Sequence, residues 1–487
     1  MYYVSTRDHS LQYTPAQAIA QGLSRDGGLF LPVSIPKLPE GALKKMTGMT
    51  YQQRAQYIMS LYLEDFTAEE LGQFAEKAYG PDKFDTPAVA PLKKVDDGTY
   101  CLELWHGPTC AFKDYALQLM PKLLVEAKKN LGRTEITRIL VATSGDTGKA
   151  ALAGYADLDG IEIEVFYPND GTSEIQHLQM ATQKGENVQV YAVEGNFDDA
   201  QTGVKRVFAD DTVAAELEAR HIRLSSANSI NWGRLVPQIV YYFYAYFRLA
   251  EQRAVAWGSP VDFCVPTGNF GDILAGYYAK QMGLPVGKLI CASNKNNVLT
   301  DFIKTGTYDA RRTFYKTTSP SMDILISSNL ERLLLHTSGS AEKVEGWMQE
   351  LAATGKYTVD ADTLAKIQAN FAAGYADDAA GAAEIRARFE RDGYLCDTHT
   401  AVAFHVAEAN RSTAPMVVLS TASPFKFPRD VLAALGETAP ESDFAAMAAL
   451  TAKTGAAAPA SLRELDKLPV RFNTVIQPGE IRAAALR

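Results

Sequence analysis

The sequence has no long hydrophobic run and no excess of basic charge. Its longest apolar run, residues 235–247, is interrupted by Pro237 and Gln238. The run is therefore too short to span a bilayer, and it predicts a buried helix instead. The first ten residues carry charge and no apolar core, which argues against a signal peptide. A net charge of −9 argues against nucleic acid as the principal partner. We therefore expect a cytoplasmic protein with neither a membrane nor a nucleic-acid partner.

Paired cysteine motifs are also missing. The five cysteines are widely scattered and form no CxxC pair. This favours reduced thiols in a cytosolic enzyme over a disulfide framework, and it predicts no metal site.

The length of 487 residues exceeds what one hydrophobic core supports, so several domains are expected. Residues 1–95 have mainly helical patterns and predict an N-terminal domain. Residues 96–440 alternate apolar strands, Gly-rich turns and helices, with a helical insertion at about 300–395. Residues 441–487 predict an Ala-rich helical tail. The alternation is typical of an α/β fold with a parallel sheet. Strands are predicted at 138–142, 161–167, 188–193, 261–265, 289–292 and 416–419.

One lysine lies where packing gives little reason for a charge. Lys113 follows Phe112 at a turn between the apolar run 100–105 and a helix start at 115–120. Partial burial favours the neutral amine, which can attack a carbonyl and form a Schiff base. The simpler interpretation is a lysine whose stem packs on Phe112 while its ammonium reaches water.

A second candidate is the turn at 266–272, where Gly268 and Gly271 flank Asn269 and Phe270 between a strand and a helix. Such a turn can direct backbone N–H groups and a helix N-terminus at a phosphate. A plain strand-to-helix turn is the alternative.

The segment at 144–149 is similar to a Walker A motif but departs from it twice. Position 143 is Thr rather than Gly, and Ala150 replaces the hydroxyl residue that binds magnesium. A P-loop-like nucleotide-binding protein, with Lys149 as the phosphate lysine, remains the alternative from a different class.

Two more polar segments complete the set. Asn228, Ser229 and Arg234 precede an apolar helix and predict either a helix cap or a phosphate clamp. Thr421 follows the strand at 416–419, where a buried hydroxyl needs a hydrogen-bond partner.

Together these stretches match the needs of pyridoxal phosphate, namely an aldehyde partner, a phosphate cradle, a carboxylate clamp and a hydrogen bond to the ring nitrogen. The chain resembles the threonine synthases of the longer type with an N-terminal domain, within the tryptophan-synthase-β-like (fold type II) family. The resemblance rests on residues 5–7, 26–29, 106–118, 142–148, 266–272, 319–324, 327–334, 397–403 and 420–427.

The resemblance implies two open parallel α/β domains with pyridoxal 5′-phosphate between them. It implies that Lys113 is the Schiff-base lysine and proton shuttle, and that Thr421 bonds the ring nitrogen. The remaining roles are a phosphate loop of Gly268, Asn269, Phe270, Gly271 and Asp272, and substrate contacts from Thr147, Asn228, Ser229 and Arg234.

The activity implied is conversion of O-phospho-L-homoserine and water to L-threonine and phosphate by a monomer or homodimer. Alternatives are another fold type II lyase or dehydratase and a relative that binds the cofactor without catalysis. One position departs from the pattern, since several relatives carry Asn where this chain has Asp146. A carboxylate there repels the cofactor's phenolate unless one of the two is protonated. His106 and His399 are expected to be hydrogen-bonded structural residues.

Overall fold

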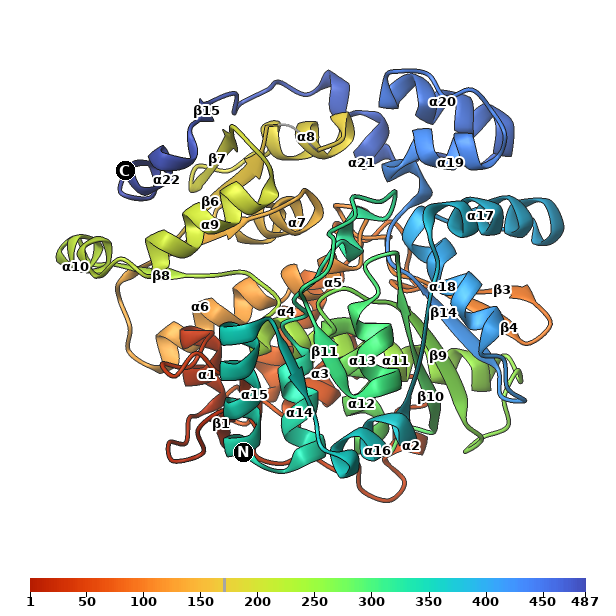
Figure 1. Cartoon of the computed structure of the whole chain (residues 1–487), viewed down its shortest axis with the longest axis horizontal. Coiled ribbons are helices and arrows are strands. Elements are labelled where there is room, and N and C mark those ends of the chain that lie inside the picture. The colour runs from red at the N-terminus through yellow and green to blue at the C-terminus, as the bar shows by residue number, and fades with distance from the viewer. Residues whose placement is uncertain (170–171) are drawn as a thin grey trace.

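The computed structural model describes residues 1–169 and 172–487, which contain two larger sheets that form two lobes (Figure 1). The six-stranded sheet has the order β13-β10-β9-β14-β4-β3, and all its neighbours are parallel except β3 and β4. Its strands are β3 (Leu92–Asp96), β4 (Thr99–Glu103), β9 (Val261–Pro266), β10 (Val286–Ser293), β13 (Phe371–Tyr375) and β14 (Met416–Ser420). The predicted α/β fold with two open parallel domains is confirmed.

The five-stranded sheet is parallel throughout and has the order β15-β7-β6-β5-β8. Its strands are β5 (Ile136–Ala142), β6 (Ile161–Pro168), β7 (Val188–Val193), β8 (Ile222–Ser225) and β15 (Val475–Ile476). Every strand predicted from the sequence is present, with its ends shifted by at most three residues.

Helices cover both faces of the six-stranded sheet, as successive residues of β9 show. The Phe263 ring packs edge-on against Tyr242 of α11, whereas the Cys264 thiol donates to the Ala403 carbonyl of α18 on the other face. The helices of this lobe are α11 (Trp232–Glu251), α12 (Gly271–Met282), α13 (Val298–Thr305), α17 (Asp378–Asp392), α18 (Thr398–Ala409), η2 (Pro424–Lys426) and α19 (Pro428–Ala434).

The five-stranded sheet is covered in the same way, with α7 on one face of β6 and α9 on the other. Its surrounding helices are α5 (Lys113–Leu117), α6 (Met120–Asn130), α7 (Asp146–Tyr155), α8 (Glu174–Ala181), α9 (Phe197–Phe208), α10 (Asp211–Ala219), η4 (Pro478–Glu480) and α22 (Ile481–Ala485).

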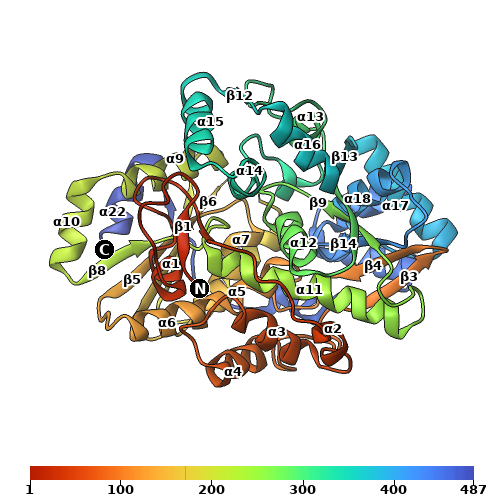
Figure 2. The ribbon, with the colours of Figure 1, turned by 90° about the horizontal axis from the view of Figure 1, so that it is seen from below.

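The N-terminal unit is mainly helical, and its α3 packs along α11 (Figure 2). Capping boxes begin three of its helices, because Thr14, Thr50 and Thr67 each exchange hydrogen bonds with the residue three positions later. The elements are β1 (Tyr3–Ser5), α1 (Pro15–Gln21), β2 (Phe30–Pro32), α2 (Ala42–Lys45), α3 (Tyr51–Ser60) and α4 (Ala68–Ala78).

The insertion at 300–395 is largely helical as expected, but it also supplies β13 as the edge strand beside β10. Its other elements are β11 (Thr307–Asp309), η1 (Pro320–Met322), α14 (Leu330–Ser338), α15 (Ala341–Thr354), β12 (Lys356–Thr358) and α16 (Ala361–Asn370). The tail holds α20 (Asp443–Thr454), α21 (Ala460–Arg463) and η3 (Leu465–Lys467), and its β15 pairs with β7 before η4 and α22. Within the described residues, no helix has the length and apolar character needed to cross a membrane.

The helices α5 and α7 approach each other closely near Lys113. A Cβ added at Gly154 of α7 would lie only 1.9 Å from the Leu117 carbonyl oxygen of α5. No side chain fits there, so the backbones pack directly.

Gly154→Ala is therefore expected to lower the free energy of unfolding by about 3 kcal/mol, since the helices must separate. The matched control is Gly346→Ala in α15, where an added Cβ meets nothing within 4 Å. It should stabilise the protein by roughly 0.5–1 kcal/mol. Thermal unfolding midpoints of the two variants should move in opposite directions, and equal shifts would contradict the close packing.

Candidate active site

Lys113 lies where strands of the six-stranded sheet end. The chain leaves β4 at Glu103 and returns to the sheet beside β14, because Phe112 N donates to the Thr421 carbonyl over 2.8 Å. An isolated antiparallel bridge pairs Ala111 with Ala422. These contacts place Lys113, the first residue of α5, close to Thr421.

The Lys113 side chain is 13% exposed, and its amine lies near two oxygen atoms. Its Nζ is 3.5 Å from Ser321 Oγ and 3.8 Å from Asp146 Oδ2. Burial lowers the pKa of Lys113 to about 8, with Asp146 opposing the shift and the Lys426 and Arg234 cations adding to it. A useful fraction of the amine is therefore neutral near physiological pH, as a nucleophile and base requires.

Asp146 is an ionised carboxylate held between two lysines. Its Oδ1 is 2.5 Å from Lys426 Nζ and accepts from Gln176 Nε2 over 3.2 Å. Burial raises the pKa of Asp146, but Lys426 and Lys113 outweigh it and hold the pKa well below its ordinary value. The positive charge of Lys426 therefore offsets the repulsion expected between the Asp146 carboxylate and the cofactor's phenolate.

Sequence reasoning missed Lys426, although the signal was present. It lies between Phe425 and Phe427, much as Lys113 follows Phe112, and it is completely buried. The reason for its burial is not local, because Asp146 comes from a distant part of the chain.

The predicted phosphate turn joins β9 to α12 and leads into the helix N-terminus. Phe270 occupies the cap position with a left-handed φ of 64°. A Cβ at Gly268 would lie 2.9 Å from Ile324 Cδ1 and 3.0 Å from the Ser321 carbonyl oxygen. The turn is therefore a backbone cradle with no space for a side chain at Gly268.

The side chains of this turn point in different directions. Asn269 is exposed, whereas Asp272 is buried against α11 and accepts from Tyr241 Oη at 2.6 Å and Tyr242 Oη at 3.0 Å. Burial raises the pKa of Asp272 to about 7, although both tyrosines lower it. Only the backbone of Asp272 is thus available to the cradle.

Arg234 is a buried cation that lacks a carboxylate partner among residues 1–169 and 172–487. One Nη donates to the Ala227 carbonyl, and Nε has no hydrogen-bond partner in the described chain. Burial lowers the pKa of Arg234 to about 10, so the side chain stays charged. A buried, incompletely paired guanidinium suits an anionic ligand.

The helix-cap role in this segment falls to Asn231. Its Oδ1 accepts from Gly233 N, and its Nδ2 donates to the Ile19 carbonyl, each over 2.9 Å. Asn228 is exposed and Ser229 half-buried just before this cap. Neither is the N-cap, so both remain candidates for binding.

Asn329 connects the two loops and was not predicted. Its backbone N donates to the Asn269 carbonyl over 3.0 Å, and its Nδ2 donates to the Ser229 carbonyl over 3.1 Å. Arg332, one turn later, donates to Asn329 Oδ1 and to the Phe30 carbonyl of the N-terminal unit. The predicted phosphate turn, the loop that contains Ser229 and the N-terminal unit are therefore joined at Asn329 and Arg332.

The segment at 143–149 lacks the features of a P-loop. Thr143 Oγ1 accepts from Gly145 N and Gly148 N at 3.0 Å, so a side chain uses two of the N–H groups. Lys149 Nζ donates to Gln183 Oε1 over 2.6 Å. The geometry thus gives no support to nucleotide binding here. Thr147 is half-buried in the first turn of α7 beside Asp146, where a substrate contact remains a prediction.

The two histidines are hydrogen-bonded, as expected. His399 Nδ1 is 2.7 Å from Asp397 Oδ2, and its Nε2 accepts from Ser321 N over 3.1 Å. His106 lies between Asp85 and Glu103 at 2.6 Å and 3.0 Å. His399 thus helps to position Ser321.

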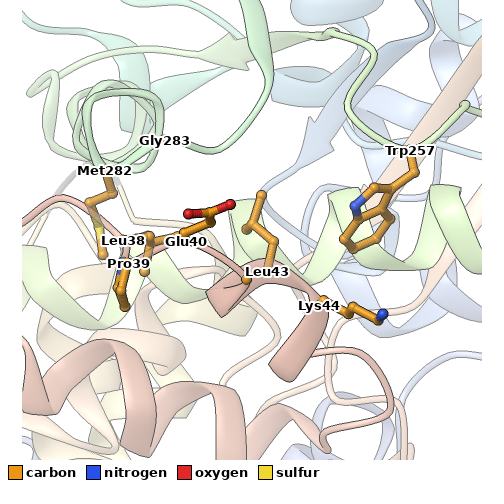
Figure 3. Close-up of a pocket in the computed structure, with 9 residues that line it drawn as sticks. Leu38, Pro39, Glu40, Leu43, Lys44, Trp257, Met282 and Gly283 are labelled. Atoms are coloured by element: carbon orange, nitrogen blue, oxygen red, sulfur yellow. The ribbon is translucent and has the colours of Figure 1, made fainter.

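A hollow on the surface lies apart from these residues (Figure 3). Trp257 and Lys44 lie on one side of it and Met282 on the other. None of the predicted site residues lines it. In the part of the chain that the structure describes, no three or more His, Cys, Asp or Glu residues gather to hold a metal ion.

Fold and site together define a pyridoxal-phosphate-dependent enzyme of fold type II. Family models match along the chain: "Threonine synthase N terminus" at residues 2–79, "Pyridoxal-phosphate dependent enzyme" at 84–421 and "Threonine synthase, C-terminal" at 400–483. The crystal structure of PLP-bound threonine synthase from Brucella melitensis aligns with a TM-score of 0.90 and 39% identity, covering 100% of this chain and 99% of that one.

Two curated relatives give the same assignment. Threonine synthase of Pseudomonas aeruginosa is 39% identical over 88% of this chain and 90% of its own. Human threonine synthase-like 1 is 42% identical over 86% of this chain, which spans only 58% of the human protein's length. The chain belongs to the threonine synthase family.

The residues present fit pyridoxal phosphate. A buried amine with a lowered pKa matches the aldehyde, and the backbone cradle at the α12 N-terminus matches the phosphate. The cradle excludes a side chain at Gly268, and the Nε of Arg234, which has no partner among the described residues, can donate to a further anion.

The burial of Lys113 predicts a distinctive reactivity. In the full-length chain without cofactor, acetylation of Lys113 should rise with a midpoint near pH 8, because its pKa is lowered to about 8. Exposed Lys129 is the control, since Glu126 raises its pKa. Competitive labelling with peptide mass spectrometry measures both, and equal midpoints would contradict the lowered pKa.

Asn329→Ala should weaken cofactor binding roughly tenfold or more, because the Ser229 carbonyl loses its donor and Arg332 loses its acceptor, so the backbone N–H that holds the Asn269 carbonyl is no longer fixed in place. Ser328→Ala is the matched control, since Ser328 makes only a 3.5 Å contact with Asn269 Oδ1. Equilibrium titration of both variants with pyridoxal phosphate measures the difference. Equal affinities would show that Asn329 does not position the turn.

Proposed function

We propose that the protein converts O-phospho-L-homoserine and water to L-threonine and inorganic phosphate. Similarity to threonine synthases along nearly the whole chain supports this proposal. The observation that carries it is the proximity of two buried cationic side chains, Lys113 and Arg234. The Arg234 guanidinium has no carboxylate partner in the described chain, and it lies close enough to Lys113 to lower the pKa of that amine. This pair suits a substrate that combines an ionisable carbon–hydrogen bond with a phosphate.

Several residues would hold the cofactor. Lys113 would hold its aldehyde carbon, the backbone of residues 268–272 its phosphate, and Thr421 its ring nitrogen. When bound, pyridoxal phosphate supplies an electron-withdrawing ring that stabilises negative charge on the substrate carbons.

Lys113 would carry protons during the reaction. Once its amine is free, it takes a proton from the substrate Cα and returns one later in the sequence. A pKa near 8 lets the same group accept and release protons near neutral pH. Its position gives the ammonium form a hydrogen-bond partner in Ser321 Oγ and an ion-pair partner in Asp146.

Arg234 and Ser229 would hold the substrate phosphate. A guanidinium can bind two phosphate oxygens at once, and its charge stabilises the negative charge that departs with phosphate. Burial keeps water from competing for this contact. Thr147 and Asn228 would orient the amino-acid end of the substrate.

We also propose the division into domains at 1–95, 96–440 and 441–487, and a cytoplasmic enzyme that acts on a small molecule as a monomer or homodimer. The acidic composition supports a small-molecule partner rather than a nucleic acid.

The test is an assay of the holoenzyme with O-phospho-L-homoserine, in which threonine and phosphate should appear in equal amounts. Arg234→Met should lower kcat/KM roughly 10- to 100-fold, the size of lost charged hydrogen bonds worth about 1.5–3 kcal/mol. Arg463→Met is the control, because this arginine is exposed and its nearest carboxylate is 3.7 Å away on the adjacent Glu464.

Phosphate release without threonine would favour the lyase alternative. Magnesium-dependent ATP binding without turnover would favour the nucleotide-binding alternative instead.

A further inference from the structure

Lys426 is an unusual lysine because it is completely buried in a site whose nucleophile is another lysine. Its Nζ contacts Asp146 Oδ1 at 2.5 Å and donates to the Thr109 carbonyl over 3.1 Å. Burying an ion pair costs desolvation energy, and an apolar pair of similar volume is often at least as stable. Stability alone therefore gives no reason for this pair.

The two carboxylate oxygens of Asp146 contact different groups. Oδ1 contacts Lys426 and Gln176, whereas Oδ2 contacts Ser321 Oγ at 3.2 Å and lies 3.8 Å from Lys113. The carboxylate is thus anchored on one side and presented to the nucleophile on the other. Gln176 is itself confined, since a Cβ at Gly145 would lie 2.6 Å from its side chain.

We propose that Lys426 is a positioning residue, a buried counter-ion that keeps the Asp146 carboxylate charged and directed at Lys113. This inference rests on the proposed function in one respect, namely that Lys113 is the catalytic lysine. Without Lys426, the desolvated carboxylate would keep Lys113 as its nearest cation and draw it into a tighter ion pair. With Lys426 in place, the charge of Asp146 is already balanced, and Lys113 is left to gain and lose protons.

Other charged groups surround this pair on several elements. Arg234 of α11 faces Lys113, and His399 of α18 faces Asp146. Asp114 of α5 and Lys149 of α7 lie on the Lys426 side. Of the carboxylates in residues 1–169 and 172–487, only Asp146 contacts both Lys113 and Lys426 directly. Changes at Lys426 should therefore reach Lys113 chiefly through Asp146.

The test is a pH titration of the visible absorbance of the holoenzyme for the wild type and for Lys426→Met, Asp146→Asn and the double variant. Lys426→Met should raise the midpoint by about one pH unit, because an uncompensated carboxylate stabilises the protonated form. Asp146→Asn should lower it, and the double variant should fall between Asp146→Asn and the wild type. Lys426→Met should also reduce kcat more than it changes KM.

The matched control is Lys149→Met. Lys149 is a lysine of the same region whose Nζ pairs with the neutral Gln183 side chain, so its loss should leave the midpoint close to the wild-type value. Thermal unfolding of all variants separates stability from positioning. Lys426→Met should lose stability, and the double variant should regain most of it.

An unmoved or lowered midpoint in Lys426→Met would overturn the proposal, even if that variant were less stable. If Lys426→Met does not fold, Asp146→Asn decides alone, and an unchanged midpoint there overturns the proposal. The titration needs only the cofactor, so failure of the wild type to make threonine would leave its result standing.

Discussion

The structure depends on how the charges of two buried lysines are balanced by a single aspartate. Lys113 and Lys426 reach Asp146 from separate segments, and each would be costly to bury alone. The direct contact of α5 with α7 at Gly154 keeps the segments of Lys113 and Asp146 in fixed relation. The position of the Lys113 amine therefore depends on backbone packing as well as on charge.

The N-terminal unit contributes to the same arrangement from outside the two lobes. Thr6 and Arg7 of this unit donate hydrogen bonds to Glu331 of α14. Its Phe30 carbonyl accepts from Arg332 of the same helix, so the N-terminal unit is held to α14 at two places. Asn329 at the start of α14 then joins the predicted phosphate turn to the loop that contains Ser229. Segments far apart in the chain therefore meet at a single helix end, which explains how a mainly helical unit without catalytic residues supports the site.

The central strands of both sheets could be predicted from the sequence, because they are apolar runs and several of them lead into Gly-rich turns. β13 could not, since Phe-Ala-Ala-Gly-Tyr has no β-branched residue and is a strand only through its pairing with β10. β15 is two residues long and depends on β7 in the same way.

The candidate site was predictable where a local pattern marks a function, as at Lys113 and the turn at 266–272. Three further residues could not be predicted, because only tertiary contacts bring them to the site. Lys426 contacts Asp146, Ser321 contacts Lys113, and Asn329 bonds two loop carbonyls. Asp272 was predicted from the motif, but its carboxyl group points away from the cradle and accepts a hydrogen bond from Tyr241.

The most direct measurement is to reduce the holoenzyme with borohydride, digest it and locate the pyridoxyl group by mass spectrometry. Three lysines, Lys113, Lys149 and Lys426, crowd the same region, and their burial alone does not distinguish them. A modification confined to the peptide that contains Lys113 is the expected result. A modification on Lys149 or Lys426, or none at all, would contradict the assignment of Lys113 as the residue that holds the cofactor.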